Sequence, residues 1–137
     1  MLIREASYTD YNGVNRKEIL YFNLEPAELM EMELGTTGGL TQMINRVIAA
    51  QDNATLVRIF KELILKAYGE KSDDGKRLVK SEAISTAFSQ TRAYSDLFME
   101  LVTDAEKAAA FVNGIVPEEI AEKAKEQQEK TVPMLPS

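Results

Sequence analysis

The chain has 137 residues, 45% of them hydrophobic, which is enough for one ordinary domain with a hydrophobic core. Its 16 Lys and Arg residues against 22 Asp and Glu residues give a net charge of -6, so the whole-molecule field repels nucleic acid and anionic lipid, and we expect neither as a partner. The absence of cysteine excludes disulfides, thiolate zinc sites and thiol nucleophiles, and no apolar run approaches the roughly 20 residues that a membrane-spanning helix needs.

The first predicted element is a β-hairpin within residues 1–25. Two extended segments flank Asn12-Gly13, the dipeptide that most readily supplies the positive φ angles of a two-residue type I′ turn. Glu25-Pro26 then ends the second strand, because proline cannot donate a hydrogen bond to a sheet.

The second strand of this hairpin is apolar on both faces. Strand periodicity places Ile19 and Tyr21 on one face and Leu20, Phe22 and Leu24 on the other. A hairpin on a helical domain needs only one buried face, so the other face is predicted to meet a client, another subunit or the C-terminal helix. We predict Leu20, Phe22 and Leu24 as the partner-binding face, with the opposite face as the alternative.

A short acidic helix is predicted over residues 26–34, and it is broken by the three glycines of segment 35–39. Among its glutamates stand Leu29, Met30 and Met32. Flexible methionine side chains adapt to different partners, but they also fill gaps in a core, and both interpretations stay open. Leu29, Met30 and Met32 complete the set of candidate partner-binding residues.

Two amphipathic helices are predicted next, over residues 40–51 and 54–68. Apolar residues in both recur at i, i+3, i+4 and i+7, which is the period of one helix face. Asn53 suits the N-cap of the second helix, and Gly69 suits its C-cap. Because the connection is short, the two helices are expected to pair antiparallel at the centre of the core.

Residues 70–117 are predicted to be mainly helical. An Asp-Gly turn at 73–75 indicates a small second hairpin or an ordered loop. Helices are then predicted over 82–90, 94–102 and 104–113, with Ser81 as the cap of the first. A Thr-Asp-Ala-Glu capping box at 103–106 starts the last of them, and Asn113-Gly114 ends it.

These elements predict an α+β fold that is mostly α, with an N-terminal β-hairpin followed by a compact bundle of about five to six helices. The hairpin (1–25) and the bundle (26–117) form one domain. Residues 118–137 have few aliphatic side chains and two prolines, so a weak helix and a flexible, disordered tail are expected there.

The residue inventory argues against catalysis. The chain has no histidine, the commonest general base and metal ligand. The acidic turn at 73–75 lacks the alternating oxygen ligands of a calcium loop, and segment 35–39 lacks the lysine of a phosphate-binding loop. For Lys76, Arg77 and Lys80, a solvated loop face is favoured over an anion or partner site. We therefore predict a protein that is not an enzyme, with no catalytic, cofactor-binding or metal-binding residues.

Several segments in order along the chain resemble the tail assembly chaperones of long-tailed bacteriophages. The most telling is Ala-Phe-Val-Asn-Gly-Ile-Val-Pro at 110–117, after Thr-Asp-Ala at 103–105. The other segments that carry the likeness are 8–13 (Tyr-Thr-Asp-Tyr-Asn-Gly), 21–24, 27–33, 66–72 and 93–101.

The resemblance implies a protein of the host cytoplasm, absent from the mature virion, that binds the tape measure protein and helps to recruit tail tube subunits. A homo-oligomer is a further expectation. The alternative is a structural virion protein or a small oligomeric adaptor without catalysis, which would use the same hairpin for permanent contacts. No catalytic residues or cofactors are implied.

Overall fold

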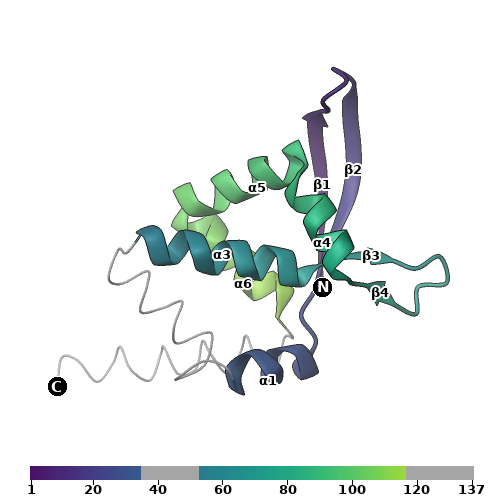
Figure 1. The fold of residues 1–137 in the computed structure, drawn as a ribbon. Coiled ribbons are helices and arrows are strands. Elements are labelled where there is room, and N and C mark those ends of the chain that lie inside the picture. The colour runs from purple at the N-terminus through teal and green to yellow at the C-terminus, as the bar shows by residue number, and fades with distance from the viewer. Residues whose placement is uncertain (35–52, 117–137) are drawn as a thin grey trace.

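An antiparallel sheet and five helices make up the part of the chain that the computed structural model describes, residues 1–34 and 53–116 (Figure 1). The elements are β1 (Leu2–Thr9), β2 (Asn15–Phe22), α1 (Pro26–Leu34), α3 (Asn53–Ala67), β3 (Tyr68–Lys71), β4 (Leu78–Val79), α4 (Glu82–Ser89), α5 (Arg92–Thr103) and α6 (Ala105–Ile115). None of these helices is long and apolar enough to cross a membrane.

This element order confirms the predicted α+β, mostly helical fold with its N-terminal hairpin. The predicted helix over 40–51 and the predicted weak helix and tail over 118–137 lie outside the described residues. The boundary of a single domain at residue 117 stays a prediction.

The hairpin turn differs from the two-residue turn that Asn12-Gly13 predicts. Thr9 pairs with Asn15, and the N–H of Asp10 donates to the carbonyl of Val14 at 2.9 Å, so three residues rather than two form the loop. The Asp10 carboxylate accepts the N–H groups of Asn12 and Val14, both at 2.9 Å. Only Gly13 is then needed in the left-handed region, at φ 77°.

The second hairpin is present, and it joins the first. β3 pairs with β4, and β3 also pairs antiparallel with β2, so the sheet has the order β1-β2-β3-β4. Gly69, predicted as a helix cap, lies in β3 instead. A Cβ at Gly69 would stand 2.6 Å from Leu78 Cγ, so glycine is required there by the close approach of β4.

The C-terminal helices have side-chain caps at their N-termini, although the bounds of α5 and α6 differ from the predicted ones. Ser81 caps α4 as predicted, and Thr91 caps α5, which begins at Arg92, two residues before the predicted start at 94. Asp104, rather than Thr103, caps α6 by accepting two backbone N–H groups. α6 continues through Gly114, where Leu2 Cδ1 would lie 3.1 Å from an added Cβ, so this glycine gives β1 room instead of ending the helix.

The core lies between the sheet and the helices, with Phe22 at its centre. The Phe22 ring is 5.4 Å from Phe111, 5.7 Å from Tyr68 and 5.9 Å from Phe88, measured between centroids. The side chains that form the core are Leu20, Phe22, Leu24, Leu29, Ile59, Phe60, Leu63, Ile64, Ala67, Phe88, Ala93, Leu97, Leu101, Ala108, Phe111 and Ile115. All described helices therefore contribute to one hydrophobic core. The turn end of the first hairpin extends beyond α5 (Figure 1).

Candidate interaction surface

Within residues 1–34 and 53–116, strand alternation gives the sheet one face that the helices cover and one face that they leave uncovered. Leu20 and Phe22 of β2 are buried on the face where α3, α5 and α6 pack. Ile3 and Ile19 point to the other face, with 58% and 50% of their surface exposed. Isoleucine is among the residues most often buried, so two half-exposed isoleucines on neighbouring strands make this face a candidate interaction surface.

An apolar row crosses this uncovered face from β1 to β4. Ile3 lies opposite Tyr21, and Tyr21 lies opposite Gly69 on β3. Two residues along β3, Lys71 pairs with Leu78 of β4, which brings both onto the same face. We name the set formed by Ile3, Ile19, Tyr21, Lys71 and Leu78 the outer sheet face.

The outer sheet face has a positive charge, although the whole chain is acidic. The Lys71 ammonium lies 5.6 Å from the centroid of the Tyr21 ring and, within the described residues, has no acidic partner. The nearby Lys17 is paired with Glu5 at 3.0 Å. An exposed apolar surface next to an uncompensated lysine fits an apolar partner segment that also carries carboxylates.

The six predicted partner-binding residues are divided between core and surface. Leu20, Phe22, Leu24 and Leu29 are all at most 5% exposed, so they form core and not a free surface of this fold. The face of β2 chosen from the sequence is the one that the helices cover. Met30 is 65% exposed, and the side chain of Met32 lies outside what the structure describes. Partner binding by Met30 stays a prediction.

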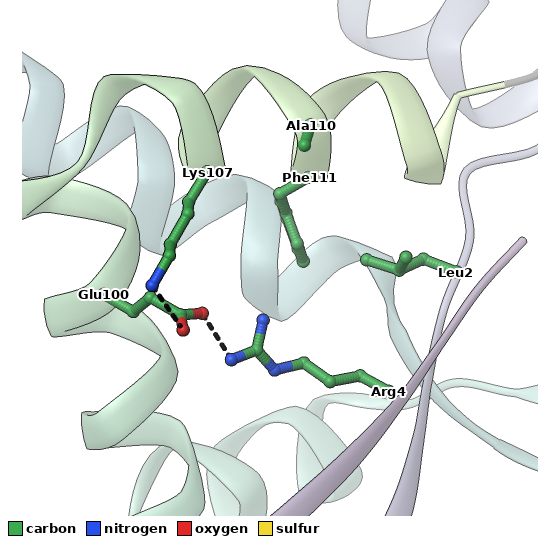
Figure 2. Close-up of a pocket in the computed structure, with 6 residues that line it drawn as sticks. All are labelled: Leu2, Arg4, Glu100, Lys107, Ala110 and Phe111. Carbon is green, nitrogen blue, oxygen red and sulfur yellow. Dashed lines mark hydrogen bonds and ion pairs between the residues drawn. The ribbon is translucent and has the colours of Figure 1, made fainter.

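A pocket of about 240 Å³ opens between β1, α5 and α6 (Figure 2). Its lining residues are Leu2, Arg4, Glu100, Lys107, Ala110 and Phe111. The Glu100 carboxylate lies between two cations, with one oxygen paired to Arg4 and the other 3.5 Å from the Lys107 ammonium. The pocket is smaller than the roughly 300 to 1,000 Å³ usual for small-molecule sites. The Arg4–Glu100 pair instead links β1 to α5, and the Glu100–Lys107 pair links α5 to α6.

A second polar contact holds α1. The Lys80 ammonium donates to the carbonyl of Asn23 at 2.6 Å and to the Glu28 carboxylate at 2.7 Å. Glu28 in turn accepts the backbone N–H of Glu25 at 3.0 Å, which is the reciprocal half of a capping box. The prediction that Lys80 belongs to a solvated loop face is therefore wrong, whereas Lys76 and Arg77 are exposed.

Comparison with known proteins identifies the family of the chain. A model of the family described as phage tail assembly chaperone matches residues 1–135, which include every described element. The chain belongs to this family. No curated protein and no solved structure matches it. The resemblance seen in the sequence is thus confirmed, and the match covers nearly the whole chain of this tail assembly chaperone.

Hydrogen bonds in the hairpin turn and burial in the core shift the pKa values of several groups of the tail assembly chaperone. A hydrogen bond from Arg16, followed by one from the Val14 N–H, lowers the pKa of Asp10. Burial raises the pKa of Tyr68 and of Tyr94 in the aromatic part of the core. Among residues 1–34 and 53–116, no group of three acidic side chains comes together to hold a metal ion. The family is generally non-catalytic, and surface contacts are what this geometry offers.

Proposed function

We propose that this tail assembly chaperone binds the tape measure protein through its outer sheet face and helps to bring tail tube subunits to it in the host cytoplasm. The observation that carries the proposal is the uncovered apolar row of Ile3, Ile19 and Tyr21 on an otherwise acidic protein. The alternation of the strands places this row opposite the core, so a partner covers it without disturbing the fold.

The physical basis is hydrophobic burial combined with solubility. Ile3 and Ile19 are about half exposed, and covering the rest of each contributes about 1 kcal/mol. Several such contacts suffice for a reversible complex, which a chaperone requires because it must release its client. The net charge of -6 keeps the complex dispersed while apolar surface of the client is covered.

Co-expression with the tape measure protein tests this function. Wild-type chaperone is expected to keep the tape measure protein soluble and to co-purify with it. The double variant Ile3→Thr, Ile19→Thr keeps β-branched side chains in both strands, so it should unfold at the wild-type temperature and lose the client. A tape measure protein that stays insoluble with wild type refutes the function, and full capture by the double variant refutes the surface.

A matched control uses exposed apolar residues elsewhere. Val57 on α3 and Met99 on α5 are 41% and 53% exposed, and neither belongs to the outer sheet face. The variant Val57→Thr, Met99→Gln should capture the client as well as wild type does. The alternative role as a structural virion protein predicts that the chain is present in purified phage particles, whereas the proposed role predicts its absence.

A further inference from the structure

The outward side of α1 is acidic and apolar. Leu29 faces the core at 5% exposure, and Glu28 is held by Lys80. Ala27, Met30 and Glu31 are exposed, and their i, i+3, i+4 spacing places them together on the opposite side of the helix. Met30 is exposed although a long apolar side chain usually lies against other apolar groups.

This side of α1 complements the outer sheet face in both polarity and charge. Met30 offers an unbranched, adaptable apolar side chain to the isoleucines Ile3 and Ile19. Next to it, Glu31 offers a carboxylate, and Lys71 on the sheet has no acidic partner in the described part of the chain. The two surfaces therefore match as a pair of apolar contacts beside one ion pair.

The two surfaces cannot meet within one folded chain. α1 is fixed by the Lys80–Glu28 ion pair at 2.7 Å and by the burial of Leu29. The segment before α1 is fixed as well, because the N–H groups of Asn23 and Leu24 donate to helix-end carbonyls of α3 and α6. The helix that reaches an outer sheet face consequently belongs to another molecule.

We propose that α1 of one copy docks on the outer sheet face of a second copy, so that the free chaperone self-associates through its client-binding surface. If both copies contribute an α1 and a sheet face, the contact closes as a two-fold dimer. The dimer covers the apolar row that would otherwise be exposed to water, and the client displaces it. That competition rests on the proposed function, whereas the contact between copies does not.

Charge exchange tests the contact directly, with the full-length chain and no client. Sedimentation equilibrium over a range of concentrations should show self-association of wild type that weakens with added salt. Lys71→Glu and Glu31→Lys should each raise the dissociation constant about tenfold or more, because each places like charges together. The double variant Lys71→Glu, Glu31→Lys restores the opposite pair and should return to within a few-fold of wild type.

Matched controls come from two exposed, adjacent residues of α3. Lys61→Glu and Glu62→Lys make the same charge changes away from both surfaces, and self-association should stay at the wild-type value. At concentrations where wild type is monomeric, thermal unfolding of every variant should match wild type, which separates a lost contact from a lost fold. A wild type that is monomeric at all concentrations, or single variants that associate like wild type, or a double variant without rescue, would overturn the proposal.

The test of the contact between copies can fail or succeed independently of the proposed function. If the chain is monomeric but captures the tape measure protein, the contact between copies is refuted and the chaperone function stands. If the chain self-associates with charge rescue but never captures the client, the contact stands and the function fails. If both hold, adding client should dissociate the oligomer, and persistence of the oligomer in the client complex would refute the competition.

Discussion

Replacing Phe22 by alanine should cost more stability than any change on the outer sheet face. The Phe22 side chain is fully buried, and its ring lies within 5.9 Å of the rings of Tyr68, Phe88 and Phe111. Truncating a buried phenylalanine costs about 3 to 5 kcal/mol, and three aromatic neighbours place this position in the upper half of that range. Ile19, three residues earlier and half exposed, should cost less than about 1 kcal/mol when changed to alanine.

Urea denaturation measures both values in the same experiment. With a denaturant slope of about 2 kcal/mol/M, Phe22→Ala should lower the unfolding midpoint by about 2 M, and Ile19→Ala by less than about 0.5 M. If Phe22→Ala does not fold, Phe22→Leu retains much of the volume and should show a smaller decrease in the same direction. A Phe22→Ala midpoint within about 0.5 M of wild type would refute Phe22 as the centre of the core.

Three further results are expected. Gly69→Ala should destabilise the fold by about 1 to 3 kcal/mol, because the added Cβ overlaps the Leu78 side chain. In a double-mutant cycle, adding Leu78→Ala should recover part of this loss, and destabilisations that simply add would contradict the overlap. Carboxyl NMR titration should place the pKa of Asp10 below its ordinary 3.8, because Arg16 and the turn N–H groups bind the charged form. The stability that the charged Asp10 adds to the fold is fully present above pH 3.8 and is lost as the pH falls through the folded pKa. Asp10→Asn should remove this pH-dependent contribution. Deleting residues 127–137 should leave cooperative unfolding intact, as their polar composition predicts, and a non-cooperative transition would contradict that.

The existence of the hairpin could be read from the sequence, but its register could not. Asn12-Gly13 correctly marks the turn, yet the Asp10 side chain takes two backbone N–H groups and lengthens the loop by one residue. The same limit applies to Gly69, which has the sequence context of a helix cap. It is drawn into β3 by pairing with Tyr21, a residue far away in the sequence. At Gly69 a contact with a distant strand overrides the local propensity, whereas at the turn the deciding contact is a local one from the Asp10 side chain.

The choice of the binding face could not be made from alternation alone. Both faces of β2 are apolar, so the pattern Ile19-Leu20-Tyr21-Phe22 indicates that one face is covered without saying which. The decision depends on where the helices pack, and in the structure α3, α5 and α6 pack on the face that carries Leu20 and Phe22. For Met30 the sequence left a core position and an exposed position open. The structure shows the side chain exposed, and partner binding by Met30 stays a prediction.

The hydrogen bond from the Leu24 N–H to the Ile115 carbonyl, 2.8 Å long, also affects how the protein is made. The hairpin leaves the ribosome early, but its apolar inner face is not covered until α6 has been synthesised. Contacts between distant parts of a chain form slowly, and uncovered strands aggregate in the meantime. We therefore expect a chain interrupted before Ile115 to leave Phe22 and Leu24 partly uncovered and to aggregate more readily than the full chain.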